Sequence, residues 1–303
     1  MIRSFDEVLK IAAERGPKTI AVACAEDAEV LMAVEAARQK GIAKAILVGN
    51  KEKIESICID KKIPIENYEV IDMKDMAEAS LKAVVLVSSG KADILMKGLV
   101  DTSILLKAVL NKEVGLRTGS VLSHVAIFEI KGYDRLFFIT DAAMAIAPDL
   151  ETKKKILLNA VMAAKALDID VPNVAVVCAK EKVNSKMPCT LDAEALQKMN
   201  ETGEISGCIV GGPFALDNAV SKKAADHKGV THPGAGEADI LLVPDIEAGN
   251  ILYKALVFFA ETKNAGILVG TKAPVVLTSR ADSDETKLNS IAMGVLMAAK
   301  GNN

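Results

Sequence analysis

Segment 277–286 (LTSRADSDET) places a serine, an arginine and several acidic side chains within ten residues. It begins at the end of an apolar run typical of a buried strand, and a helical pattern follows it. Ser279 and Arg280 are therefore expected where ligands bind in parallel α/β folds, between a strand end and a helix start. Helix N-terminal N–H groups and a two-pronged guanidinium both suit a phosphate. The alternative is a capping box formed by Asp282 and Glu285, with Arg280 in a surface ion pair.

A second predicted strand-to-helix junction follows the apolar run 93–96. Lys97 supplies a cation, and Gly98 allows a ligand to approach the backbone closely. Thr102 and Ser103 offer hydroxyl groups near the helix start. The spacing is not that of a P-loop. A capped helix with a solvated lysine is the alternative interpretation.

Other motifs are weaker or absent. The sequence Gly211-Gly212-Pro213-Phe214 predicts a tight turn between a strand and a helix. No G-x-G-x-x-G or G-x-S-x-G pattern occurs, which argues against a standard dinucleotide fold and against an α/β-hydrolase. Neighbouring residues on a strand point to opposite faces, so Ser123 and His124 do not suit a nucleophile–base pair. The remaining signals concern anions at helix starts.

The elements that would position these residues alternate along the chain. Helical patterns separate most of the short apolar runs, which favours a mainly parallel sheet buried on both faces. The region 119–140 differs, because two apolar runs joined by KGYD predict an antiparallel hairpin. We place a domain break just after it, near 140–148. The runs that predict strands are 19–24, 45–48, 68–71, 93–96, 174–178, 205–210, 240–243, 267–269 and 274–278.

Composition restricts the class of protein further. A 303-residue chain with 50% hydrophobic residues predicts a globular protein of one large or two medium domains. A formal net charge of −3 gives no general attraction to nucleic acid or to an anionic membrane. Five cysteines without a C-x-x-C pair and three scattered histidines predict neither disulfides nor a metal centre. The N-terminus lacks signal-peptide features and no apolar stretch reaches about 18 residues, so we expect a soluble, cytoplasmic protein.

Taken together, several phrases resemble the phosphate acetyl/butyryltransferase family over nearly the whole chain. They are KGLVDTSILLKAVLNKEVGLRTG, SHVAIFE, PDIEAGNILYKAL and APVVLTSRADS, and the phrases MPCTLDAEALQKM and HKGVT are similar to its butyryl-transferring members. The resemblance implies two α/β/α domains with mainly parallel sheets and an interdomain cleft, as in isocitrate and isopropylmalate dehydrogenases. It also implies that the last helix returns to the first domain, giving domains 1–139 plus 281–303 and 140–280.

The resemblance implies a reversible reaction in which a short acyl group moves between coenzyme A and phosphate. The CoA thiolate would attack the acyl phosphate directly in a ternary complex. Arg280 would bind the phosphate and stabilise its charge, and Ser279 would donate a hydrogen bond to the reacting group. Lys97, Thr102 and Ser123 would complete the phosphate site. No metal or permanently bound cofactor is implied; acyl-CoA is a substrate.

The base that accepts the thiol proton is less certain from the sequence. Acetyl-transferring relatives have an aspartate seven residues after the serine, and this chain has Thr286 there. Glu285 is our first candidate and Asp282 our second, although either can simply cap the helix. A thiol with a pKa near 8.5 is partly ionised at neutral pH, so a base would help without being obligatory.

Acyl preference and assembly are also expectations from the resemblance. We expect butyryl to be preferred, with Met144, Met187, Pro188 and Phe214 lining the acyl pocket, although such residues are more often core. The chain is expected to form a homodimer or a higher homo-oligomer, and to be linked through butyrate metabolism to an acyl-phosphate kinase.

Three alternatives remain open. An acetyl-CoA-preferring phosphate acetyltransferase would differ in its acyl preference, and a metal- and NAD-dependent dehydrogenase of the same fold would reduce a nicotinamide cofactor. A CoA-binding or anion-binding sensor would bind CoA without releasing a thiol from acyl-CoA.

Overall fold

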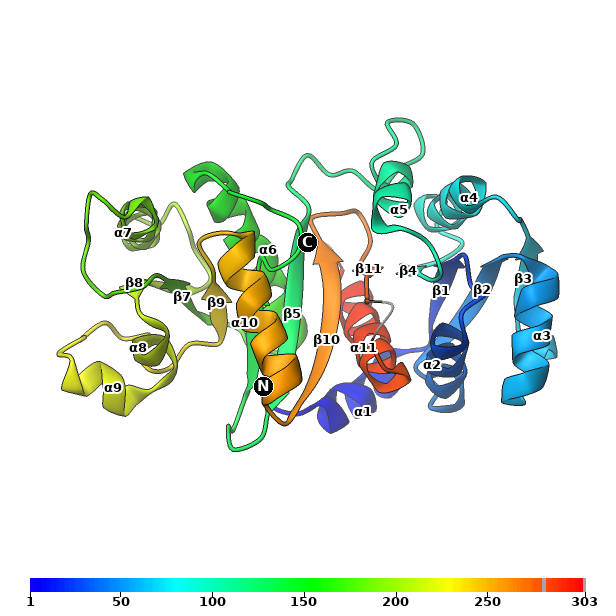
Figure 1. Ribbon diagram of the computed structural model, residues 1–303, viewed down its shortest axis with the longest axis horizontal. Helices are drawn as coiled ribbons and strands as arrows, with labels where there is room; N and C mark the ends of the chain where they lie inside the picture. Colours follow the sequence, from blue (N-terminus) through cyan, green and yellow to red (C-terminus); the bar gives the residue numbers. More distant parts are fainter. Residues whose placement is uncertain (280–281, 302–303) are drawn as a thin grey trace. The chain divides into compact units, whose positions relative to one another are not determined.

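The computed structural model describes residues 1–279 and 282–301. These form two compact units, each built from segments that are separate in the sequence (Figure 1). The central unit contains Met1–Ser4 and Val121–Lys263. The terminal unit contains Phe5–Ser120 and the chain from Asn264 onward. In each unit helices flank a sheet, and most paired strands are parallel, so the predicted α/β class is confirmed.

The sheet of the terminal unit has the strand order β3-β2-β1-β4-β11-β10. Its strands pair in parallel, except that β10 runs antiparallel to β11. The inner strand β4 is buried along its whole length, as expected for a parallel sheet covered on both faces. The strands are β1 (Lys18–Ala23), β2 (Ala43–Gly49), β3 (Glu69–Asp72), β4 (Ile94–Lys97), β10 (Thr262–Val269) and β11 (Val275–Val276).

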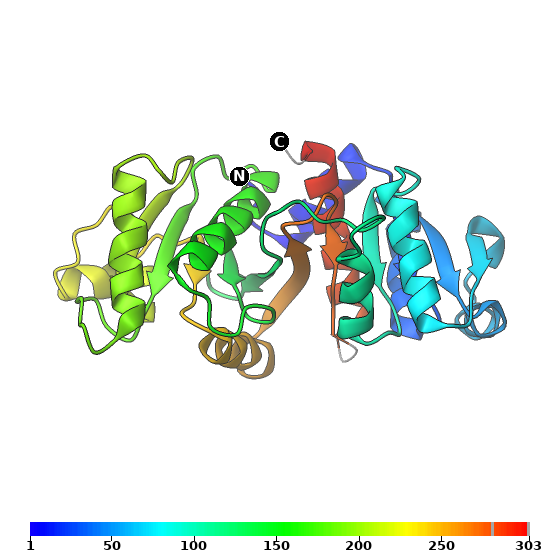
Figure 2. The same cartoon turned by 90° about the horizontal axis from the view of Figure 1, so that it is seen from above.

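The last helix, α11 (Asp284–Lys300), packs against α1 and α2 as well as against the sheet (Figures 1 and 2). The helical pattern predicted after segment 277–286 is confirmed, and Leu288 and Ile291 are buried, but burial extends all around the helix. Every residue from Lys287 to Met297 is buried, because other helices cover the faces that the sheet leaves open. The other helices of this unit are α1 (Phe5–Arg15), α2 (Ala28–Gln39), α3 (Lys51–Lys61), the 3-10 helix η1 (Ile65–Asn67), α4 (Met76–Ser88) and α5 (Thr102–Val109).

The sheet of the central unit has the order β5-β6-β9-β7-β8. The strands β5 (Ser123–Ile130) and β6 (Leu136–Thr140) pair antiparallel, which confirms the predicted hairpin. The remaining pairs are parallel. The other strands are β7 (Asn173–Val177), β8 (Ile209–Phe214) and β9 (Ile240–Leu242), and the helices are α6 (Leu150–Ala166), α7 (Pro188–Glu201), α8 (Leu216–Val220), α9 (Lys222–His227) and α10 (Ile246–Phe259).

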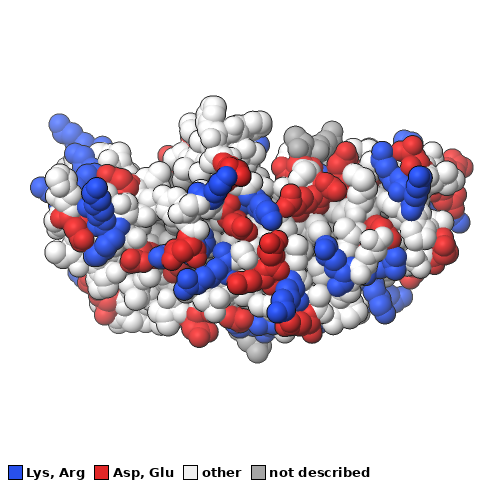
Figure 3. All heavy atoms as spheres, turned by 90° about the horizontal axis from the view of Figure 1, so that it is seen from below, with Lys and Arg blue, Asp and Glu red and all other residues white. Residues whose placement is uncertain are grey.

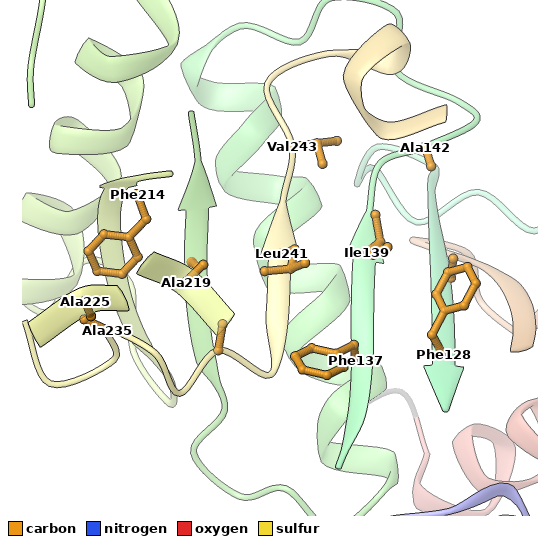
Figure 4. Close-up of a cluster of buried hydrophobic side chains, with 13 residues drawn as sticks. Phe128, Phe137, Ile139, Ala142, Phe214, Ala219, Ala225, Ala235, Leu241 and Val243 are labelled. Carbon is orange, nitrogen blue, oxygen red and sulfur yellow. The ribbon is translucent and has the colours of Figure 1, made fainter. Parts of the chain in front are cut away.

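A hydrophobic cluster fills the space between this sheet and the helices α8 and α10 (Figure 4). Phe137 and Ile139 of β6 point into it with Leu241 of β9, as the two-residue period of a strand requires. Leu252 and Leu256 of α10 pack on the cluster from the outside. This core fixes α10 over the strand that ends at Thr140.

The boundaries of the two units differ from the predicted domains. The hairpin strand β6 pairs with β9, which places the hairpin in the central unit rather than with residues 1–120. The strand β11 pairs with β4, which places the segment before Ser279 in the terminal unit. Both pairings join strands that are far apart in the sequence, and the local sequence pattern does not reveal them.

Asp, Asn and Ser side chains cap the starts of several helices. Each accepts a hydrogen bond from a backbone N–H in the first turn, which satisfies a donor that the helix leaves open. The caps are Asp27 for α2, Asn50 for α3, Asp75 for α4, Asp149 for α6, Asp245 for α10 and Ser283 for α11.

Both charge signs are interspersed on the face drawn in Figure 3, in line with a net charge of −3. Among the described residues, no helix combines the length and the apolar character that crossing a bilayer demands.

The terminal unit contains a buried carboxylate, Glu35, whose ionisation is expected to stabilise the fold. Glu35 is 7% exposed, and its oxygens accept hydrogen bonds from Arg38 (2.8 Å), Gln39 (2.8 Å) and the Tyr68 hydroxyl (2.5 Å). The hydrogen bonds from Arg38 are the main reason that the pKa of Glu35 falls from 4.5 to about 2. A lowered carboxyl pKa stabilises the fold above pH 4.5, and this stabilisation is lost as the pH falls towards 2.

We therefore expect Glu35→Gln to lower the free energy of unfolding at pH 7 by about 2 kcal/mol, a value reduced because Arg38 is partly exposed. The difference from the wild type should shrink as the pH falls from 4.5 to 2. Urea unfolding at several pH values measures this. Glu55→Gln is the control, because the Glu55 carboxylate lies 3.8 Å from Lys51 in an ion pair on the surface. A pH-independent difference would contradict the assignment.

Candidate functional site

The turn around Ser279 joins the end of β11 to the start of α11. The Ser279 backbone N–H donates to Oδ2 of Asp282 at 2.7 Å. Ser283 caps α11, since its Oγ accepts from the Thr286 N–H at 3.2 Å. The predicted junction of strand, short loop and helix is therefore confirmed. Arg280, the predicted phosphate ligand, lies outside the described residues.

Lys287 fixes this turn from inside the unit. Its side chain is buried, with the residue only 2% exposed, and its ammonium group donates to the carbonyl oxygens of Ser279, at 3.5 Å, and of Asp282. These two carbonyl groups lie on either side of positions 280 and 281, so one cation connects both ends of the turn. The sequence did not predict this role. The available signal was that Lys287 lies four residues before Ile291 on a buried helical stripe, where a lysine requires a polar partner.

The two candidate bases have different surroundings. The carboxylate of Asp282, which is half-buried, accepts the Ser279 N–H and so shapes the turn. Glu285 is an exposed residue in the first turn of α11. The predicted capping box is wrong in one respect, because Ser283 and not Asp282 provides the side-chain cap of the helix.

The second predicted junction, between β4 and α5, lies at the same edge of the sheet. Lys97 is the last residue of β4 and is 6% exposed, with its ammonium group 3.4 Å from the Gly98 carbonyl oxygen. Thr102 is the first residue of α5. The neighbouring parallel strands β4 and β11 are in register through Met96 and Val276, so their C-terminal ends lie together. The structure thus brings the Lys97 and Ser279 turns to one sheet edge.

Gly98 is required at this edge for a steric reason. A Cβ atom built on it would lie 2.1 Å from the Cys24 carbonyl oxygen and 2.7 Å from that of Ala23. The Gly98 N–H donates to the Ala23 carbonyl at 2.8 Å, and the Leu99 N–H donates to that of Cys24 at 2.7 Å. This packing holds the backbone after Lys97 close to the end of β1. The predicted close approach is therefore to the protein's own backbone.

Ser123 belongs to the central unit, at the start of β5. It is completely buried, and its Oγ accepts a hydrogen bond from the Asn159 amide at 2.9 Å. The same amide donates to the Val121 carbonyl at 3.0 Å. Asn159, which the sequence did not indicate, thus fixes the position of the Ser123 hydroxyl. The role of Ser123 in phosphate binding stays a prediction.

The four predicted acyl-pocket residues also lie in the central unit. Met144 is half-buried in the turn after β6, where its N–H donates to Oδ1 of Asp141 at 2.9 Å. Met187 and Pro188 lie at the start of α7. Phe214 is the last residue of β8, 3% exposed, and packs in the core shown in Figure 4. Their common role as an acyl pocket stays a prediction.

The interpretation of the segment around Phe214 needs a correction. Gly211-Gly212-Pro213-Phe214 was predicted to form a turn after a strand at 205–210, but these residues are part of β8. A Cβ on Gly211 would lie 2.6 Å from Nδ1 of His232. A Cβ on Gly212 would lie 2.9 Å from Cβ of Val176, so both positions require glycine. Close packing, and not turn formation, accounts for the two glycines.

Asp141 organises the loop that follows β6. It is 3% exposed, and its carboxylate accepts N–H groups of His124 (3.0 Å), Ala143 (2.8 Å) and Met144 (2.9 Å). Gly249 of α10 packs against this loop, since a Cβ there would lie 2.8 Å from the Asp141 carbonyl oxygen. The helix α10 therefore supports the loop that carries Met144.

Metal ligation is a separate matter. Within residues 1–279 and 282–301, no group of three or more His, Cys, Asp or Glu residues is arranged to hold a metal ion.

Comparison with known proteins gives one consistent result. The family model described as Phosphate acetyl/butaryl transferase matches residues 4–80 and 73–295. A phosphate butyryltransferase of Clostridium beijerinckii is 54% identical over 300 residues, which is 99% of each chain. A phosphate acetyltransferase of Thermotoga maritima is 47% identical over 97% of this chain and 99% of its own.

A solved structure agrees with this result. The crystal structure of a branched-chain phosphotransacylase from Enterococcus faecalis has a TM-score of 0.84 and 35% identity, covering 93% of this chain and 99% of that one. The chain belongs to the phosphate acetyl/butyryl transferase family.

Proposed function

We propose that this protein is a phosphate acyltransferase that transfers a short acyl group reversibly between coenzyme A and inorganic phosphate. The observation that carries the proposal is that β4 and β11 end side by side at one edge of the sheet in the terminal unit. The buried Lys97 lies there at the end of β4, just before α5. The Ser279 turn, which Lys287 holds, lies there just before α11. Cations and helix N-termini at one sheet edge suit a tetrahedral anion. Relatives named phosphate butyryltransferase and phosphate acetyltransferase support the same reaction.

The proposed chemistry is a direct transfer within a ternary complex. The CoA thiolate attacks the carbonyl carbon of the acyl phosphate, a C–S bond forms, and the C–O bond to phosphate breaks. Phosphate leaves with the electron pair, and Arg280 neutralises its charge while Ser279 donates a hydrogen bond. Glu285, or Asp282 as the second candidate, accepts the thiol proton. Holding both substrates in one site removes the entropic cost of their encounter from the chemical step.

Lys97, Thr102 and Ser123 are proposed to complete the phosphate site. Lys97 contributes a point charge in a buried position, where its interaction with an anion is screened less than in water. Thr102 contributes a hydroxyl at the start of α5. The Ser123 hydroxyl still has its proton to donate, because Asn159 is the donor in their hydrogen bond.

Butyryl is the proposed preferred acyl group, with Met144, Met187, Pro188 and Phe214 as candidate pocket residues. A second candidate is an acetyl-CoA preference, which the Thermotoga maritima relative favours by its name. One methylene contributes about 1–3 kcal/mol to discrimination, so activity on neighbouring chain lengths is expected.

The remaining proposals concern the setting of the reaction. We propose a cytoplasmic homodimer or higher homo-oligomer that needs neither metal nor permanently bound cofactor. Its acyl phosphate product is the substrate that an acyl-phosphate kinase of butyrate metabolism would consume. No nucleic acid or membrane partner is proposed.

Thiol release from acetyl-, propionyl-, butyryl- and valeryl-CoA, measured with and without phosphate, tests the function. We expect release to require phosphate, with kcat/KM for butyryl-CoA about tenfold or more above that for acetyl-CoA. A higher value for acetyl-CoA would favour the second candidate. Binding of CoA without any thiol release would overturn the transferase assignment.

The same assay after EDTA treatment tests the independence from metal. Activity is expected to be unchanged, and loss of activity that a divalent ion restores would contradict the proposal. Reduction of NAD(P) with hydroxy acids, measured in parallel, would instead favour a dehydrogenase.

A further inference from the structure

Two of the five cysteines lie in contact within the central unit. Cys178 follows β7 directly and is 7% exposed, and Cys189 is the half-buried second residue of α7. The two thiols form a hydrogen bond. Burial, assisted by this contact, raises the pKa of Cys178 from 9.0 to about 12, so its thiol is almost fully protonated at neutral pH.

The packing of α7 on the sheet explains why the two thiols meet. The helix α7 lies against β7 and β8 (Figure 1), and it runs back along β7 because β7 and β8 are parallel. A Cβ built on Gly212 would lie 2.9 Å from Cβ of Val176 and 3.2 Å from Cβ of Ala193, so the strand and the helix meet there. Cys178 follows Val176 by two residues on the same strand face. Cys189 precedes Ala193 by one helical turn on the same helix face, so the same packing brings the two cysteines together.

Cys189 is the cysteine that a reagent in solution reaches most readily, because the other four are buried. The sulfur of Cys24 lies 3.7 Å from the Met76 carbonyl oxygen, and that of Cys208 lies 4.0 Å from the Ser206 carbonyl oxygen. Of the five cysteines, all of which the structure describes, Cys189 alone combines access to solvent with a second thiol beside it.

We propose that Cys189 is a site of oxidative modification by low-molecular-weight disulfides, and that Cys178 converts the modified thiol into an intramolecular disulfide. In the first step the Cys189 thiolate attacks one sulfur of the small disulfide, an S–S bond to Cys189 forms, and one small thiolate leaves with the electron pair. In the second step the Cys178 thiolate attacks the Cys189 sulfur, and the second small thiolate leaves. The protein gives up two protons and two electrons, and the small disulfide is reduced to two thiols.

The surroundings of the two thiols suit these separate roles. A raised pKa makes Cys178 a slow nucleophile towards reagents in solution. Its attack on Cys189 is intramolecular, and the contact between the two side chains gives that step a high effective concentration. Cys189 therefore reacts first and Cys178 second.

The new bond closes the loop 179–188 at its base. The buried Thr190 anchors this loop to the start of α7, since its hydroxyl accepts the Asn184 N–H at 2.9 Å and donates to the Met187 carbonyl oxygen at 2.8 Å. Bonded sulfur atoms lie about 2 Å apart, which is closer than hydrogen-bonded thiols approach. The start of α7 must therefore shift towards β7 when the bond forms, and Met187 and Pro188 must shift with it.

This shift makes the modification a means of regulation. The regulatory effect rests on the proposed function, in which Met187 and Pro188 line the acyl pocket. Displacing residues that line the pocket is expected to lower kcat/KM for butyryl-CoA by about tenfold. The effect on acetyl-CoA should be smaller, because its shorter acyl group extends less far into the pocket.

Mass spectrometry of the reduced whole protein after addition of glutathione disulfide tests the modification. The wild type is expected to lose two hydrogen atoms, and proteolytic digestion should yield linked peptides that contain Cys178 and Cys189. Dithiothreitol should reverse the change. A wild type that keeps a bound glutathione, or that does not react, would overturn the proposal.

Three variants assign the two roles. Cys178→Ala is expected to retain one glutathione on Cys189, because the second step is blocked. Cys189→Ala should neither gain glutathione nor lose hydrogen. Cys208→Ala is the matched control, because Cys208 is a buried cysteine of the same unit, and it should form the disulfide as the wild type does. Formation of a disulfide in Cys189→Ala would contradict the assignment.

The effect on activity is measured on the same samples after glutathione has been removed. Loss of thioester absorbance from butyryl-CoA with phosphate gives the rate without an added thiol reagent. Oxidised wild type is expected to be slower and to recover with dithiothreitol, whereas Cys189→Ala should respond to neither treatment. An unchanged rate in the oxidised wild type would refute the effect on the acyl pocket. Absence of activity in the reduced wild type would instead refute the transferase assignment, which the mass measurement does not depend on.

Discussion

Arg280→Ala is expected to lower kcat/KM for butyryl-CoA in the presence of phosphate by about 10²–10³-fold. Removing a fixed donor that stabilises developing charge typically has an effect of this size. Arg280 is proposed to neutralise the phosphate as it leaves or attacks, so the loss should fall mainly on turnover. Cooperative unfolding should be retained, as urea titration of the variant will measure.

Two further variants test whether the loss of activity is due to the guanidinium group at position 280. Arg280→Lys keeps the positive charge but loses the two-pronged geometry, so we expect an activity between those of wild type and Arg280→Ala. Arg3→Ala is the matched control, because Arg3 is an exposed residue of the central unit with its guanidinium 3.9 Å from Asp134. Unchanged phosphate-dependent thiol release in Arg280→Ala would refute the proposed site.

Local sequence signals predicted those parts of the site that depend on neighbouring residues. The junctions after β4 and β11 were predicted because an apolar run, a short polar segment and a helical pattern occur within about fifteen residues of each other. The helix after segment 277–286 was predicted for the same reason, and in the structure Ser283 caps it. Capping and strand burial are short-range effects, so the sequence contains them directly.

Features that depend on distant contacts were not accessible in this way. The strand β8 runs through two glycines and a proline because Val176 and His232 pack closely against it, and local propensity predicts a turn there. The pairing of β6 with β9 and of β11 with β4 likewise joins segments that are far apart in the sequence. The turns that contain Lys97 and Ser279 also lie together because of a distant contact, since the register of β4 and β11 brings both to one edge of the sheet.

Lys287 is the clearest case of a residue whose role the sequence conceals. It occurs in a helix after two acidic residues, where a lysine commonly forms an exposed ion pair. Its burial arises because α1 and α2 cover α11, and its hydrogen bonds arise because the chain turns back from β11. The resemblance to the family pointed to Ser279 and Arg280 but gave no indication of what holds their turn.

We expect Lys287→Met to lower kcat/KM by about 10–100-fold and to raise the KM for phosphate. Methionine can fill much of the same volume but cannot donate to the carbonyl groups of Ser279 and Asp282. Without those bonds the turn can shift, and a displacement of about 1 Å in a positioned group can reduce the rate by about 10²-fold. Steady-state kinetics at varied phosphate concentration, with unfolding measured in parallel, tests this expectation.

The variant Lys153→Met shows whether Lys287→Met acts on the position of the Ser279 turn or only on the stability of the fold. Lys153 is another buried lysine, 5% exposed, whose ammonium group meets Asp192 at 2.6 Å in the central unit. Its replacement leaves a carboxylate without its partner, so we expect lower stability with the KM for phosphate unchanged. If Lys287→Met and Lys153→Met lose stability equally and neither changes the KM, then Lys287 is a structural residue only. If only Lys287→Met raises the KM, the buried ammonium group acts on catalysis through the turn that it fixes.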